Sequence, residues 1–81
     1  MLAQVGNDSE GQEYLNFMRK DRISTDHVKK VEGEKTGSAF ILSQKDGENS
    51  IILNGGANMH MPDTIDASWH QTIAKANILL L

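Results

Sequence analysis

The first quarter of the chain begins with an apolar run and continues with a helical pattern. Leu2–Val5 is apolar and precedes the turn residues Gly6–Asp8, which predicts a short buried strand that ends in a turn. Ser9 and Gln12 then match a capping box, so we expect a helix to start there. Apolar or small residues recur along this helix at i, i+3, i+4 and i+7, which predicts one buried stripe. The stripe consists of Gly11, Tyr14, Leu15 and Met18.

The middle of the chain has the pattern of β-strands. Val28–Val31 alternates apolar residues with lysine, as a half-exposed strand does. Residues 37–44 and 49–54 are two apolar-rich runs on either side of Asp46-Gly47. Because Asp-Gly supplies the positive φ angles of a tight type I′ turn, these two runs predict a β-hairpin.

The last third of the chain predicts a helix followed by a strand. Pro62 suits the first turn of a helix. An apolar stripe at helical spacing follows, made of Ile65, Trp69, Ile73 and Ala76. Ile78–Leu81 is continuously apolar, which is typical of a strand in a parallel sheet covered by helices on both faces.

Together these elements predict an α/β fold that lacks most of its sheet. The first and last predicted strands are separated by a helix, a hairpin and a second helix, and the chain begins in one strand and ends in the other. We therefore expect a piece of a larger α/β domain. The alternative is a compact αβ miniprotein.

The predicted hairpin is apolar on both faces. Ala39 and Ile41 point to one face, and Phe40 and Leu42 point to the other. A surface hairpin ordinarily presents one polar face to water. We therefore expect one face to cover a core or a ligand and the other to meet a second element or chain, unless the hairpin is buried within its own domain.

Composition narrows the class of protein. The 81 residues carry 8 Lys and Arg against 11 Asp and Glu, a formal net charge of −3, and no basic cluster that would suit nucleic acid. There is no cysteine, which excludes disulfides and thiol chemistry. Neither a signal peptide nor an apolar run long enough to span a membrane is present. We therefore expect a cytoplasmic globular protein with no nucleic-acid or membrane partner.

Few residues suggest chemistry by themselves. His27, His60 and His70 share no metal-ligand spacing, and the acidic residues are scattered, so we predict no metal site and no catalytic residue. The segment Gly55–Asn58 could form an anion-binding nest, but it lacks the Lys-Ser/Thr that follows in a phosphate-binding loop. We interpret it as a tight connection.

Five short motifs nevertheless occur in an order that resembles the PfkB family of carbohydrate kinases, and its ribokinase branch more than fructokinases or adenosine kinases. These motifs are Val5-Gly6-Asn7-Asp8-Ser9-x-Gly11, Ile23-Ser24-Thr25, Glu34-x-Thr36-Gly37-x-Ala39, Asp46-Gly47-Glu48-Asn49 and Gly56-Ala57-Asn58. The resemblance covers the whole chain, which corresponds to about the second quarter of a typical member. It implies a Rossmann-like core with a small β-sheet lid, divided here into 1–27 (core strand and helix), 28–55 (lid strands and hairpin) and 56–81 (return loop, helix and core strand).

The resemblance also implies a function. The chain would be a segment of an ATP-dependent ribose kinase that supplies the lid over the sugar. Ala39 and Ile41 would make apolar contact with ribose, and residues 56–58 would shape the return from lid to core. The full-length parent would use ATP and Mg²⁺ and would form a homodimer through paired lids.

The same resemblance places the remaining kinase motifs outside these 81 residues. The Gly-Gly-Lys-Gly-Ala-Asn sugar signature, the Asp-Thr-x-Gly-Ala-Gly-Asp motif with the catalytic base, and the sugar-contacting glutamate are all absent. The segment alone should therefore bind no cofactor and be inactive. Two alternatives stay open: a non-catalytic fragment that pairs with the lid of another kinase, or a parent specific for another sugar or a nucleoside.

Overall fold

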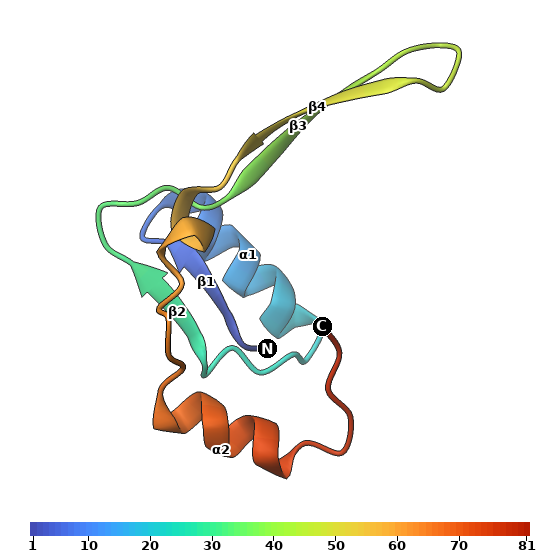
Figure 1. The fold of residues 1–81 in the computed structure, drawn as a ribbon. Coiled ribbons are helices and arrows are strands. Elements are labelled where there is room, and N and C mark those ends of the chain that lie inside the picture. The colour runs from blue at the N-terminus through green and yellow to red at the C-terminus, as the bar shows by residue number, and fades with distance from the viewer.

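The computed structural model describes all 81 residues and shows a small α/β body from which a long hairpin projects (Figure 1). The elements follow in the order β1 (Ala3–Gly6), α1 (Ser9–Lys20), β2 (Val28–Val31), β3 (Ser38–Ser43), β4 (Asn49–Asn54), the 3₁₀-helix η1 (Gly56–His60) and α2 (Ala67–Lys75). The predicted α/β class, the hairpin and the two helices are confirmed.

The body is built on two parallel strands. β1 pairs with β2 from Ala3↔Val28 to Gly6↔Val31, so β2 lies in the body rather than beside the hairpin strands with which the predicted division grouped it. Helix α1 packs on this sheet and buries Leu15 and Met18 against Val5, each 3% exposed. Parallel strands joined by a helix are the βαβ unit of an open α/β sheet.

Two details of α1 differ from the prediction. The N-cap is Asp8, whose side chain accepts a hydrogen bond from the Gly11 N–H at 2.9 Å, and Ser9 is the first helical residue. Tyr14 is 53% exposed, so the buried stripe is reduced to Gly11, Leu15 and Met18. The sheet beside α1 has only two strands, so it offers little surface on which a wider helix stripe could pack.

The hairpin pairs β3 and β4 antiparallel, from Ser38↔Asn54 to Ser43↔Asn49. The predicted two-residue type I′ turn is wrong, because the loop has three residues, Lys45 to Gly47. Gly47 alone has a positive φ (90°), and its N–H donates to the Gln44 carbonyl at 3.1 Å, as in a type I turn with a glycine bulge. The Asp46 carboxylate accepts from the Glu48 N–H at 3.1 Å, which favours this wider turn.

The C-terminal third is less regular than predicted. Helix α2 begins at Ala67 with Asp66 as its N-cap, and Pro62 lies in the irregular segment before it. Of the predicted apolar stripe, only Trp69 is buried. Its indole N–H donates to the His27 carbonyl at 3.1 Å. The predicted strand at residues 78–81 does not form, because neither sheet extends to it and its side chains stay exposed.

Candidate functional site

The hairpin register sorts its apolar side chains onto two faces. Residues directly opposite on an antiparallel pair share a face, and neighbours along a strand alternate. Ala39 lies opposite Leu53, and Ile41 lies opposite Ile51. We call these four residues the Ala39 face. The opposite, Phe40 face consists of Phe40, Leu42 and Ile52.

Both faces of the hairpin are open to solvent in this chain. Phe40 is 65% exposed, Ile41 59% and Leu53 76%. Within residues 1–81, therefore, no other element buries the hairpin. Contiguous exposed apolar surface of this kind marks a site of contact with a ligand or another protein surface.

The two predicted sugar-contact residues, Ala39 and Ile41, lie together on one face of the hairpin. Sequence reasoning missed Leu53 and Ile51, which the register adds to that face. Their apolar character was visible in the run 49–54, but their face depends on the length of the turn, which the Asp-Gly signal misjudged by one residue.

The first leg of the hairpin is fixed to the body by Asp8. The Asp8 Oδ2 accepts from the Thr36 N–H at 2.8 Å, and its Oδ1 accepts from the Thr36 hydroxyl at 2.6 Å. The Thr36 hydroxyl oxygen in turn accepts from the Gly6 N–H at 3.0 Å. These hydrogen bonds join the end of β1, the start of α1 and the residue two positions before β3.

The same hydrogen bonds lower the pKa of the Asp8 carboxyl to about 2, from an ordinary value of 3.8. The side-chain bond from Thr36 is the largest cause, followed by the backbone bonds from Thr36 and Gly11, and the charge of Lys35 adds to them. Asp8 is therefore ionised near neutral pH and fully engaged as an acceptor, which suits it to holding structure rather than to transferring protons.

The second leg returns through the glycine-rich segment. The Ala57 N–H donates to the Lys35 carbonyl at 2.8 Å, and Ala57 is fully buried. Gly56 has a φ of +49°, and a Cβ there would collide with the Lys35 carbonyl. The interpretation of residues 55–58 as a tight connection is supported, because the Ala57 N–H that a nest would offer to an anion is already used.

A polar cavity of about 250 Å³ lies at the root of the hairpin, on the side of Phe40. Its lining comprises Asp8, Ser9, Glu10, Lys35, Thr36, Ser38, Phe40 and Asn54. Since Ser38, Phe40 and Asn54 share one face of the hairpin, this cavity opens away from the Ala39 face.

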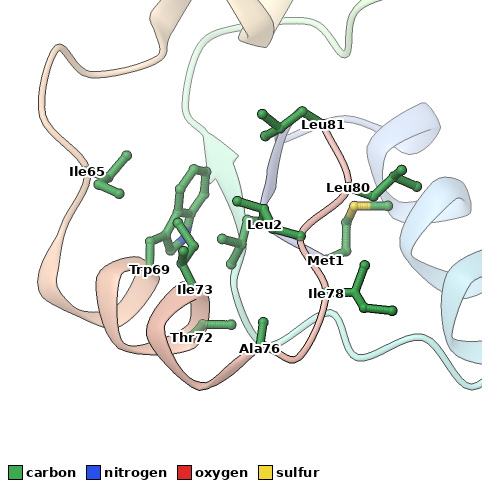
Figure 2. Close-up of a pocket in the computed structure, with 11 residues that line it drawn as sticks. Met1, Leu2, Ile65, Trp69, Thr72, Ile73, Ala76, Ile78, Leu80 and Leu81 are labelled. Carbon is green, nitrogen blue, oxygen red and sulfur yellow. The ribbon is translucent and has the colours of Figure 1, made fainter.

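A larger cavity of about 460 Å³ lies between α2 and the two ends of the chain (Figure 2). Trp69 and Ile73 of α2 face Leu2 and the C-terminal leucines across it, and Thr72 is its one polar side chain. An apolar lining of this kind offers packing surface but no group that could activate a substrate.

The remaining candidate groups are dispersed. His60 Nε2 lies 3.0 Å from a carboxylate oxygen of Glu34, while His27 and His70 have no acidic partner. No three His, Asp or Glu side chains gather where they could hold a metal ion. None of the helices is both long and apolar enough to cross a bilayer.

Comparison with known proteins gives consistent matches. The family model "pfkB family carbohydrate kinase" matches residues 1–81. The ribokinase of Schizosaccharomyces pombe is 38% identical over 81 residues, which are 100% of this chain and 26% of that protein. The chain thus spans about a quarter of the length of the curated relatives it matches.

Solved structures agree with the sequence matches. Arabidopsis thaliana ribokinase complexed with ribose and ATP superposes with a TM-score of 0.77 and 31% identity, over 89% of this chain and 24% of that one. Ribokinase from Cryptococcus neoformans in complex with ADP gives a TM-score of 0.69 and 35% identity, over 82% and 21%.

Proposed function

The chain belongs to the pfkB family of carbohydrate kinases, and from that membership we propose that it is a segment of an ATP-dependent ribose kinase. The parent would convert D-ribose and ATP to D-ribose 5-phosphate and ADP, and the hairpin β3–β4 would be its sugar-covering lid. The family and the ribokinase-type fold, both predicted from the motifs, are confirmed.

The observation that carries this proposal is the hairpin itself. It projects from the body with both apolar faces exposed, so its apolar side chains are available for contact (Figure 1). A lid that closes over a sugar excludes water, and the phosphoryl group then passes to a sugar hydroxyl instead of to water. The relative solved with ribose and ATP shares the fold over most of this chain.

We assign the sugar contact to the Ala39 face. Ala39 and Ile41 are the residues that the family resemblance points to, and Leu53 joins them because it lies directly opposite Ala39. The small side chain of Ala39 leaves space between two larger ones, Ile41 and Leu53, where the apolar face of a sugar ring could pack.

The chemical step belongs to other parts of the parent. Transfer of the γ-phosphoryl group needs a base, a phosphate cradle and Mg²⁺. The carboxylates of this chain do not converge on a metal site, and Asp8 is committed to hydrogen bonds within the fold. ATP and Mg²⁺ would thus be held outside residues 1–81, and the segment alone would be inactive. We further propose that the parent acts in the cytoplasm.

The Phe40 face would then mediate pairing of two lids. Phe40, Leu42 and Ile52 point away from the proposed sugar side and are exposed. Covering such a face against its copy in a second subunit buries apolar surface on both, as a two-fold homodimer requires.

A chimera tests the sugar contact. Residues 1–81 replace the matching segment of the S. pombe ribokinase, and steady-state kinetics with ribose compare the chimera with its Ala39→Asp variant. A charge buried against the sugar should raise the KM for ribose about tenfold or more, a loss of about 1.4 kcal/mol. Lys45→Asp, a carboxylate at the exposed hairpin tip outside both apolar faces, should leave that KM unchanged.

An unchanged KM in the Ala39→Asp chimera would remove Ala39 from the sugar site. A panel of pentoses, hexoses and nucleosides given to the unsubstituted chimera tests the substrate class, because a nucleoside turned over faster than ribose would favour the alternative parent.

The exposed Phe40 face favours one further candidate function, a non-catalytic fragment that pairs with the lid of an intact kinase. Size-exclusion chromatography of the 81-residue chain mixed with an intact ribokinase would show co-elution if this pairing occurs. Separate elution at micromolar concentrations would count against it.

A further inference from the structure

The hairpin meets the body only at its root, through a small set of hydrogen bonds and the buried Ala57. One leg is held to the body by the bonds from Thr36 to Asp8, and the other is tied to this leg by the bond from Ala57 to the Lys35 carbonyl. Every residue of β4, and all of β3 except Ser38, is exposed, so side-chain packing of the strands cannot set the angle between hairpin and body.

Asp8 uses its carboxylate for two purposes at once. The bond from the Gly11 N–H caps α1, and that task needs a single oxygen. The remaining bonds go to Thr36, 28 residues further along the chain. A helix cap alone does not require this second set of bonds.

The surrounding backbone is closed tightly around the same contact. A Cβ on Gly6 would lie 2.5 Å from the Thr36 nitrogen, and a Cβ on Gly11 would lie 2.9 Å from the Thr36 hydroxyl. Glycine at both positions therefore permits Thr36 to approach Asp8. Three separate segments are shaped to make this one junction.

From this geometry we infer that Asp8 and Thr36 form a latch that fixes the direction in which the hairpin leaves the body. Asp8 is thereby a positioning residue for the Ala39 face. That the hairpin points toward a sugar bound by the rest of the kinase rests on the proposed function. The latch itself rests only on the contacts between Asp8 and Thr36.

Asparagine at position 8 separates the two tasks of the carboxylate. Asn is as good an N-cap as Asp, so its amide oxygen can still accept from Gly11. Its amide nitrogen is a donor and cannot accept from the Thr36 N–H. Thr36→Val removes the hydroxyl at nearly constant shape from a residue outside α1, and Thr36→Ser restores the hydroxyl.

Pulsed electron paramagnetic resonance on the full 81-residue chain reports the direction of the hairpin as a distance between one spin label on the body and another at the hairpin tip. The chain has no cysteine, so spin labels attach only at Lys20→Cys, at the end of α1, and Lys45→Cys, at the hairpin tip. Both lysines are exposed. We expect a narrow distance distribution in the unsubstituted background and in Thr36→Ser, and loss of the narrow peak in Asp8→Asn and Thr36→Val.

Asp66→Asn is the matched control. Asp66 also caps a helix and accepts from a second segment, through Lys29, but it makes no bond to the hairpin, so its variant should keep the narrow peak. Far-UV circular dichroism records helix content in parallel. If Asp8→Asn lowers the helix content, the distance distribution of Thr36→Val, which leaves the helix cap in place, becomes the test of the latch.

Three results would overturn the latch: a narrow peak retained in both Asp8→Asn and Thr36→Val, a broad distribution already present in the unsubstituted background, or equal broadening in Asp66→Asn. None of these outcomes depends on ribose phosphorylation, so the latch and the proposed function can fail separately.

Discussion

The body and the hairpin use apolar residues for different purposes. In the body, Leu15 and Met18 are 3% exposed and pack on the β1–β2 sheet. In the hairpin, Phe40 and Leu53 are more than half exposed and belong to no buried cluster. The body therefore depends on buried area for stability, whereas the hairpin depends on its own ladder and on hydrogen bonds at its root. Since the chain spans about a quarter of the length of its relatives, this apolar surface is open to contact with the rest of a kinase, a ligand or a second copy.

Truncation in the body should have the largest effect. Leu15→Ala removes a central side chain from the small cluster with Val5 and Met18, and we expect a loss of about 2–3 kcal/mol in the free energy of unfolding. Urea unfolding followed by far-UV circular dichroism measures it. A loss below about 0.5 kcal/mol, the range typical of surface positions, would contradict the assignment of this cluster as the core.

Acid should weaken the junctions next. The folded-state pKa of Asp8 is about 2, against 3.8 ordinarily, and the hydrogen bond from Lys29 lowers that of Asp66 in the same direction. The folded state favours the charged form of both carboxyls, so this stabilisation is complete above about pH 5 and is lost as the pH falls through 3.8 toward 2.

The urea midpoint should therefore be level above about pH 5 and decline below pH 4. Lys35 and Glu10 lie beside Asp8 and carry opposite charges. Asp8→Asn combined with Asp66→Asn should flatten the decline. An equally steep decline in the double variant would assign it to other carboxyls.

The hairpin turn should respond locally. Gly47 has a φ of 90°, and an alanine there would be strained by about 1–2 kcal/mol. Gly47→Ala should speed hydrogen exchange of the β3 and β4 amides while the α1 amides keep their protection. Faster exchange in α1 as well would mean that hairpin and body unfold as one unit.

The smallest effect is expected on the exposed hairpin faces. Leu53→Ser should change the free energy of unfolding by less than about 0.5 kcal/mol, because Leu53 is 76% exposed. A loss comparable to that of Leu15→Ala would show that the hairpin packs on the body.

Local patterns predict most of the elements, whether or not their partners lie nearby in sequence. Helix α1, β2 and both hairpin strands were predicted from periodicity, and strand alternation alone placed Ala39 and Ile41 on one face. The strand expected at 78–81 was wrong, because an apolar run forms a strand only where another strand offers hydrogen bonds. Pro62 suits a helix start, but the chain places the N-cap of α2 at Asp66 and begins the helix at Ala67.

Two features of the site could not be predicted from local pattern. A two-residue turn at Asp46-Gly47 would have placed Ile52 opposite Ile41, whereas the three-residue loop places Ile51 there and Leu53 opposite Ala39. The bonds between Asp8 and Thr36 join residues 28 apart, and only the tertiary fold brings them together. The capping signal identified the helix start to within one residue but could not reveal the second partner of its cap.

If the Ala39 face covers the sugar, ribose should change the hydrogen exchange of the hairpin in the chimeric kinase. Adding ribose should slow exchange of the amides of β3 and β4, residues 38–43 and 49–54, with little change in α1. Ribose binding that slows exchange elsewhere in the kinase and leaves both hairpin strands unchanged would contradict it.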